Sequence, residues 1–264
     1  MTRSACLTVA RRGAASVITE LASRAPVGLR PLAPAGTRAR VAVVQTSACL
    51  VAGDDVVLEV RVGPGASLEI VELSATLAHP VTAKLPAIRQ TIRVEVGADG
   101  RLLWLAEPLI LAAATRMHRR LDVTTATGSR ALLGESVVLG RDGEHPGAAT
   151  TRLRITRDGR AVLDDSLRTD DAAVLRCDAV VGTARVCASL TLVGVDAPDP
   201  LPAGALRLEA QGTTLRCLGA GAVEVRARLA PVASAWGRVL GGQSADGAGS
   251  DPRSHDAARP SGSF

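Results

Sequence analysis

Apolar and polar positions alternate along most of the chain, and this pattern predicts strands far more often than helices. Clear examples are ARVAVVQ (39–45), DVVLEVRV (55–62) and LLGESVVL (132–139), each bounded by turn residues. Further strands are predicted in SVITELA (16–22), TIRVEV (91–96), RLDVTT (120–125), TRLRIT (151–156) and RVCASLTLV (185–193). The chain is therefore expected to be mainly β.

Four segments share one plan, in which an alternating strand is followed by a short glycine-containing turn and a second strand. They are VLEVRVGPGASLEI, TIRVEVGADGRLLWL, RLDVTTATGSRALLGE and RLRITRDGRAVLDD. Their turn glycines, Gly65, Gly100, Gly128 and Gly159, recur about every 30 residues, which is the range of stacked repeats. Glycine supplies the positive φ that tight hairpins need. We predict an irregular β-helix-like stack of repeated hairpins; a chance succession of ordinary hairpins is the alternative.

Helical patterns are confined to the C-terminal part. APVASAWGRVL (230–240) is predicted to form a helix with Trp236 on its apolar face, stopped by Gly241-Gly242. A short helical turn is predicted around 170–176. Residues 241–264 contain few apolar side chains and are predicted to be a disordered tail, which leaves residues 1–240 as a single β domain.

Composition narrows the class of protein. Hydrophobic residues make up 47% of the 264 positions but aromatic residues only 1%, so the core must be aliphatic. No apolar run reaches the roughly 18 residues of a membrane span. The net charge of +5 comes almost entirely from scattered arginines without interleaved aromatics, which argues against nucleic acid. Five widely spaced cysteines and the absence of an apolar leader favour reduced thiols and a cytoplasmic location.

The stretch LLWLAEPLIL (102–111) places Glu107 and Pro108 inside an apolar run. A buried carboxylate is costly unless it is paired or coordinated, and proline cannot donate to a sheet ladder. Asp55, Glu135 and Asp142 have polar or turn neighbours, and we expect them to be solvated turn carboxylates. No nucleophile elbow, phosphate-binding loop, dinucleotide fingerprint or zinc spacing occurs, so no enzyme is predicted.

Three ordered motifs resemble the urease accessory protein family UreD, also called UreH. They are CLVAGDDVVLEVRVGPGASLEI (49–70), LLWLAEPLILAAATRMHRRLDV (102–123) and LLGESVVLGRDGE (132–144). The family pattern contains a GGD element, a strand, GPGA, a threonine-rich segment, LEWLPQ and a final LGR…GE element. The resemblance covers roughly residues 16 to 230.

Several motif positions differ from the family pattern. Ala48-Cys49 replaces the leading glycine pair, Leu103 replaces the acid before the tryptophan, and Ala106-Glu107 replaces Pro-Gln. Together with the arginine- and alanine-rich composition, these differences resemble a divergent, actinobacterial-type member from a GC-rich genome.

The resemblance implies a largely β, irregular β-helix-like fold and a non-enzymatic function. It implies a urease maturation chaperone that binds the urease apoprotein, a UreF-like helical accessory protein and a UreG-like GTPase, and that helps to deliver nickel. No stably bound cofactor is implied; nickel would be in transit through an internal channel lined by polar and acidic groups. A β-helix or β-sandwich binding module unrelated to urease is the alternative hypothesis.

The resemblance also suggests which residues line the nickel path. Asp54 matches the acid of the GGD element, and Glu144 matches the GE element. His145, next to Glu144, would add a nitrogen ligand. Glu107 is assigned from its apolar surroundings, because the family more often has glutamine there. Carboxylates suit an ion in transit better than thiolate cages, whose affinity would trap it.

Overall fold

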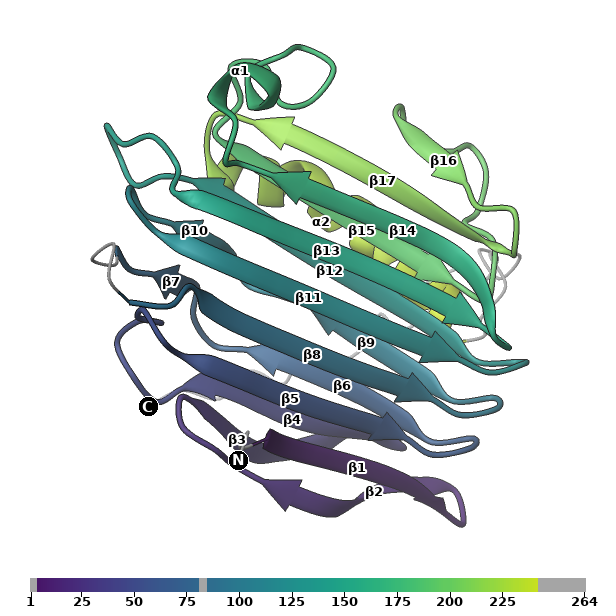
Figure 1. The fold of residues 1–264 in the computed structure, drawn as a ribbon. Helices are drawn as coiled ribbons and strands as arrows, with labels where there is room; N and C mark the ends of the chain where they lie inside the picture. Colours follow the sequence, from purple (N-terminus) through teal and green to yellow (C-terminus); the bar gives the residue numbers. More distant parts are fainter. Residues whose placement is uncertain (1–3, 81–84, 242–264) are drawn as a thin grey trace, which may run out of the picture.

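The apolar alternation builds two β-sheets that pack face to face in the computed structural model, which describes residues 4–80 and 85–241 (Figure 1). The first sheet has the order β14 (Arg160–Arg168), β13 (Ala148–Arg157), β11 (Arg116–Thr125), β8 (Ile88–Val96), β5 (Asp55–Val62), β1 (Ser4–Arg12) and β2 (Ala15–Ala22). The second has the order β16 (Ala205–Arg207), β17 (Gly212–Gly219), β15 (Val186–Val193), β12 (Arg130–Leu139), β9 (Arg101–Leu105), β6 (Ser67–Glu72), β4 (Arg38–Gln45) and β3 (Val27–Ala35). Two short strands, β7 (Thr76–Ala78) and β10 (Leu109–Leu111), extend the second sheet beside β12.

Successive strands alternate between the sheets and stack as coils. The chain passes from β5 to β6, from β8 to β9 and from β11 to β12, and each strand pairs in parallel with its counterpart in the next coil. Antiparallel strands flank this parallel centre at both ends. The predicted mainly β, β-helix-like stack is therefore confirmed.

The repeated glycine turns connect the strands differently from the predicted hairpins. The turns that contain Gly65, Gly100 and Gly128 carry the chain from the first sheet to the second, and only the turn at Gly159 closes a hairpin, between β13 and β14. Gly65, Gly128 and Gly159 have positive φ as predicted, whereas Asp99 takes this conformation (φ 56°) in the turn before Gly100. Gly100 is instead required by space, because a Cβ there would lie 2.8 Å from the carbonyl oxygen of Gly97.

The C-terminal helix packs on the outer face of the second sheet (Figure 1). α2 (Ala222–Leu240) ends where predicted but begins eight residues before 230, because AVEVRARL reads locally as an alternating strand and Pro231 reads as a helix start. Trp236 is 1% exposed and packs against Leu132 and Leu190 of the sheet. A four-residue α1 (Ala172–Leu175) occupies the predicted turn, and no helix in the described ranges is long and apolar enough to span a bilayer. The predicted tail lies outside the described residues from 242 onward.

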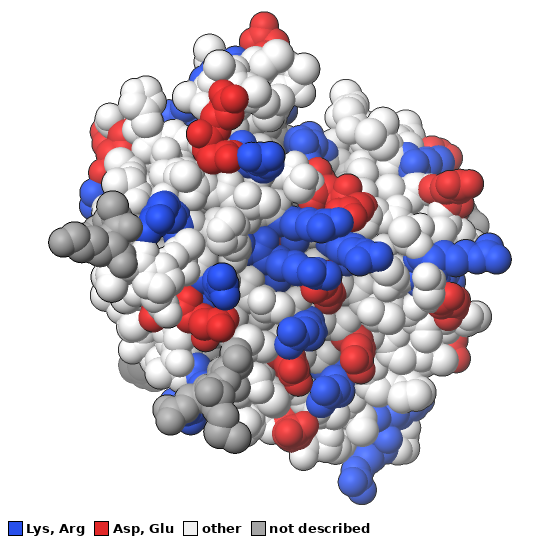
Figure 2. All heavy atoms as spheres, in the orientation of Figure 1, with Lys and Arg blue, Asp and Glu red and all other residues white. Residues whose placement is uncertain are grey.

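The outer face of the first sheet has no covering helix and carries charged rows that run across the strands (Figure 2). In one row, Glu59, Arg93, Asp122, Arg154 and Asp164 lie in register on five neighbouring strands. Opposite charges at neighbouring positions stabilise a sheet modestly, and the charged side chains favour contact of this face with solvent. Arginines alternate with acids in this row, whereas Arg120 and Arg152 are neighbours in another row, and Figure 2 shows a group of basic side chains near the centre of this face.

Two apolar clusters fill the space between the sheets. The larger lies toward the glycine turns and includes Val60, Val94, Leu121 and Ile155, and the smaller lies at the opposite strand ends and includes Met117. All of these side chains are inward-facing positions of the alternating pattern. The boundary between the clusters is where the candidate site lies.

Candidate functional site

A layer of polar side chains separates the two apolar clusters. On most strands, the inward row of apolar side chains is interrupted once. Arg119 of β11 lies in register with Gln90 of β8 and Thr151 of β13, so the interruptions fall at one level across the first sheet. We call the following nine inward-facing residues the polar layer: Gln45, Glu72, Gln90, Arg119, Glu135, Thr151, Asp165, Ser189 and Arg216.

Arg119 is at the centre of this layer and joins the two sheets. Its Nε donates to Oε1 of Gln90 (3.1 Å), and its Nη1 donates to Oε1 of Glu135 on β12 of the opposite sheet. The Arg119 and Glu135 side chains are only 11% and 15% exposed. Burial alone would lower the pKa of Arg119, but the adjacent Glu135 carboxylate raises it above its usual value. The Arg119 guanidinium therefore stays protonated and carries a permanent positive charge between the sheets.

Glu72, at the end of β6, is the second carboxylate of the layer. Its Oε1 accepts from the Nε1–H of Trp104 (2.9 Å), and its Oε2 accepts from the backbone N–H of Glu107 (3.0 Å). Burial raises the pKa of Glu72 although these two donors and the charge of Arg119 act in the opposite direction. Glu72 thus has a strongly desolvated carboxylate, which a further cation would stabilise.

Small cavities lie on both sides of Arg119. One of about 50 Å³ is lined by Gln45, Glu72, Gln90 and Trp104 among others, and the other, of about 40 Å³, is lined by Arg119, Glu135 and Asp165 among others. Each is large enough for one or a few water-sized groups. The layer thus contains small spaces bordered by both polar and apolar side chains.

The far end of the layer lies where β14, the edge strand of the first sheet, faces β17, the last strand but one of the second. Here Nη2 of Arg216 donates to Oδ2 of Asp165, and the two side chains are 41% and 34% exposed. Cys187 lies in the wall of the second cavity, and burial raises the pKa of its thiol. All five cysteines fall in the described part of the chain and are free thiols.

Glu107, predicted to line a channel, has its carboxylate on the outer side of the second sheet. Nη2 of Arg226 on α2 donates to its Oε2, and both residues border a groove of about 250 Å³ between α2 and the sheet. The backbone N–H of Glu107 donates to Glu72 of the polar layer, whereas its carboxylate pairs with Arg226. Pro108 is the last residue of the gap between β9 and β10, which fits a residue that cannot donate to a sheet ladder.

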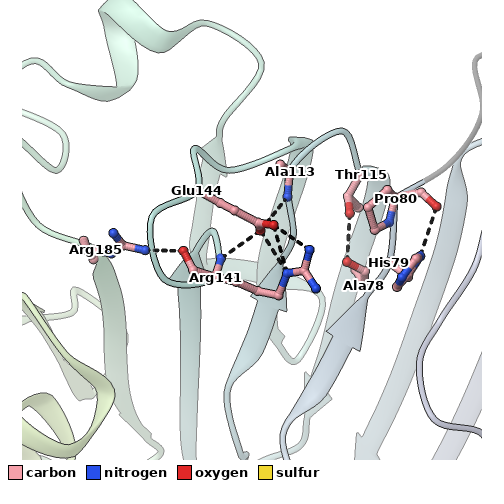
Figure 3. Close-up of polar contacts among 8 residues, drawn as sticks. All are labelled: Ala78, His79, Pro80, Ala113, Thr115, Arg141, Glu144 and Arg185. Carbon is pink, nitrogen blue, oxygen red and sulfur yellow. Dashed lines mark hydrogen bonds and ion pairs between the residues drawn. The ribbon is translucent and has the colours of Figure 1, made fainter.

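Glu144 holds a loop together at the strand ends opposite the glycine turns (Figure 3). Its carboxylate accepts from Nε of Arg141 (3.0 Å) and from the backbone N–H groups of Ala113 (3.1 Å) and Arg141 (3.2 Å). These contacts, the Arg141 side chain first, lower the pKa of Glu144 to about 2. The neighbouring His145 is exposed.

Asp54 has a comparable local contact, because its Oδ2 accepts from the backbone N–H of Val51 (2.8 Å) in the turn before β5. Among the described residues, no three histidine, cysteine or acidic side chains form a group that could hold a metal ion. Asp54, Glu107, Glu144 and His145 are thus not assembled into one site, and their place on a nickel path stays a prediction.

Sequence reasoning missed the three acids of the polar layer, Glu72, Glu135 and Asp165. Glu135 was expected to be a solvated turn carboxylate, and this was wrong: it is an inward position of β12, buried by Arg119 of the opposite sheet. Glu72 was not among the predicted site residues. The only sequence signal would have been a polar residue at an inward position in repeat after repeat, which requires knowing the strand register.

Comparison with known proteins shows to which protein family this chain is related. The family model described as "UreD urease accessory protein" matches residues 3–248. The chain is 36% identical over 217 residues to "Urease accessory protein UreD 1" of Streptomyces griseus, covering 82% of this chain and 84% of that protein. It is also 36% identical to the UreD of Streptomyces avermitilis (83% and 86% covered) and 34% identical to that of Streptomyces coelicolor (86% and 89% covered). The chain belongs to the UreD urease accessory protein family.

Proposed function

We propose that this chain is a non-catalytic factor of urease maturation that forms a scaffold on the urease apoprotein and passes nickel along the polar layer between its sheets. Membership of the UreD family supports the role in urease maturation. The observation that carries the nickel route is the row of oxygen donors and small cavities that crosses an otherwise aliphatic interior.

The donor set of the layer suits an ion in transit. Carboxylate and amide oxygens from Glu72, Gln90 and Glu135 bind divalent cations, and they hold them less tightly than a thiolate cage would. The one cysteine in the cavity wall, Cys187, has a raised thiol pKa and so resists forming the thiolate that binds metal. Nickel would thus be cargo, with no cofactor stably bound.

The partners follow from the family rather than from a surface. We propose that a UreF-like helical protein and a UreG-like GTPase join this chain on apo-urease in the cytoplasm. The wide two-sheet stack, with one face covered by α2 and the other bare, provides separate surfaces for them (Figure 1).

The test is urease activation in cells that express the urease operon with variants of this chain. Glu72→Gln with Glu135→Gln removes both central carboxylate charges and is expected to reduce nickel-dependent urease activity at least tenfold. Glu95→Gln is the matched control, since this side chain is 66% exposed on the outer face. Undiminished activity in the double variant, with normal recovery of the complex, would exclude the layer as the route.

The four residues predicted from the sequence are tested in the same assay. Single alanine variants at Asp54, Glu107, Glu144 and His145 distinguish a wider path from the layer alone. If Glu107→Ala leaves activation unchanged, its carboxylate has no part in the path, which would fit its ion pair with Arg226 on the outer side.

A further inference from the structure

The position of Arg119 divides the polar layer in two. Its guanidinium donates to Gln90, which lines the first cavity, and to Glu135, which lines the second. Arg119 itself lines only the second cavity and Glu72 only the first. The guanidinium therefore stands between the two spaces that an ion crossing the layer would have to visit.

The charges around Arg119 are those that a divalent cation would balance. Two carboxylates, Glu72 and Glu135, lie near one buried guanidinium, which is paired directly with Glu135 and attracts Glu72. With Arg119 in place, the three groups sum to one negative charge. With its charge removed, the two carboxylates require two positive charges, which a single divalent cation provides.

The positively charged Arg119 guanidinium and a passing cation repel each other strongly in a desolvated space. Both therefore cannot occupy the centre of the layer together. Arginine has a long side chain with several rotatable bonds. Asp165, 34% exposed and paired with Arg216, lies on the wall of the second cavity, so an Arg119 side chain that turned toward the edge of the stack would share this carboxylate with Arg216. Movement in that direction would leave Gln90, Glu72 and Glu135 facing one another.

We propose that Arg119 is a gate in the polar layer, occupying the central cation position between Glu72 and Glu135 and admitting a divalent cation only when its side chain leaves. The gate rests on the proposed nickel route. It makes the layer closed to ions in the isolated chain and open only when Arg119 is drawn aside.

Nickel binding by the purified full chain tests the gate, with NiCl2 as the probe. Arg119→Gln removes the charge but keeps a donor for Glu135, and it is expected to bind one nickel ion at least tenfold more tightly than the wild type in equilibrium dialysis. Arg119→Lys keeps the charge and should bind no better than the wild type. Arg120→Gln, at the next position of β11 and exposed on the outer face with Asp122, is the matched control.

The site assignment is tested by Arg119→Gln combined with Glu135→Gln, which should lose the gain in nickel affinity. A folded Arg119→Gln that binds nickel no better than Arg119→Lys overturns the gate. If Arg119→Gln folds poorly, recovery of its thermal transition on addition of NiCl2 supports the gate, and failure to recover overturns it.

Failure of the gate and failure of the nickel route give different results. If the Glu72 and Glu135 variants abolish urease activation while Arg119→Gln has ordinary nickel affinity, the route stands and the gate is wrong. If Arg119→Gln binds nickel tightly while activation does not depend on Glu72 and Glu135, the central cation position stands and the route is wrong.

Discussion

Two arginine–glutamate pairs in this molecule have the same chemistry and opposite surroundings. Arg119 and Glu135 meet between the sheets, where both side chains are largely buried, and the neighbouring carboxylate of Glu72 has a raised pKa. Arg141 and Glu144 meet in a surface loop, where the arginine side chain is 50% and the glutamate side chain 22% exposed, and where backbone N–H groups complete the hydrogen bonding of the carboxylate and its pKa falls to about 2 (Figure 3).

The two surroundings give the carboxylates different roles. Glu144 stabilises its loop, whereas the carboxylates of the polar layer are available to a cation. Glu144 accepts hydrogen bonds from four N–H donors and its pKa is lowered, so it stabilises its loop and gains little from an added ion. In the layer, Glu72 and Glu135 both lie near one arginine, and burial raises the pKa of Glu72, so an additional positive charge beside Glu72 is favourable. The buried carboxylates are thus better suited than Glu144 to interact with a metal in transit.

The largest expected effect comes from breaking the buried pair. Glu135→Leu leaves the Arg119 guanidinium desolvated without its partner, which should cost about 3–5 kcal/mol of unfolding free energy. Urea denaturation measures the loss. The double variant Arg119→Met with Glu135→Leu should recover most of it, because the unpaired guanidinium is gone and Glu72, whose pKa burial already raises, can take up a proton; a double variant as unstable as the single one would contradict a charge-based cause.

A control for that experiment is available on the outer face of the same sheet. Asp164→Leu removes the partner of Arg152, but both side chains are more than 40% exposed and water replaces the ion pair. The stability should change little. A loss equal to that of Glu135→Leu would show that burial does not distinguish the two environments.

The second effect is the pH dependence that Glu72 contributes. The folded-state pKa of Glu72 lies above the 4.5 of the free side chain, so the folded state takes up the proton first as pH falls. Relative to Glu72→Gln, the wild type should therefore gain stability between neutral pH and about pH 4.5. The lost contact to Trp104 or Glu107 adds a constant offset, so the slope of unfolding free energy against pH is the quantity to compare. A flat difference would contradict the raised pKa.

Local sequence predicted the central strands and the end of α2, because both depend on periodicity and on glycine stops, but it missed β1, β3 and β17. It could not distinguish a turn that closes a hairpin from one that crosses between sheets, since both require the same glycine conformation at Gly65 or Gly128. Glu107 was predicted to line a channel because its sequence neighbours are apolar, but those neighbours face different sides of the sheet. Glu135 lies beside Gly134 and Ser136 and looked solvated, because its burial comes from Arg119 in the other sheet. A contact between the two sheets joins residues that are far apart in the sequence, so a short stretch of sequence does not reveal it.

The smallest effect is expected at Glu144 and has the opposite sign. Its folded-state pKa of about 2 lies below 4.5, so the stability it contributes is fully present above pH 4.5 and is lost as pH falls toward 2. Between pH 4.5 and 3 the wild type should lose stability relative to Glu144→Gln, whereas Glu72 titrates mainly above this window. Urea denaturation across both windows, with Asp142→Asn in the same loop as control, separates the two carboxylates. If Glu144→Gln instead shows the pH slope expected for Glu72, the loop carboxylate is the desolvated one and the contrast between a structural and a cation-seeking carboxylate fails.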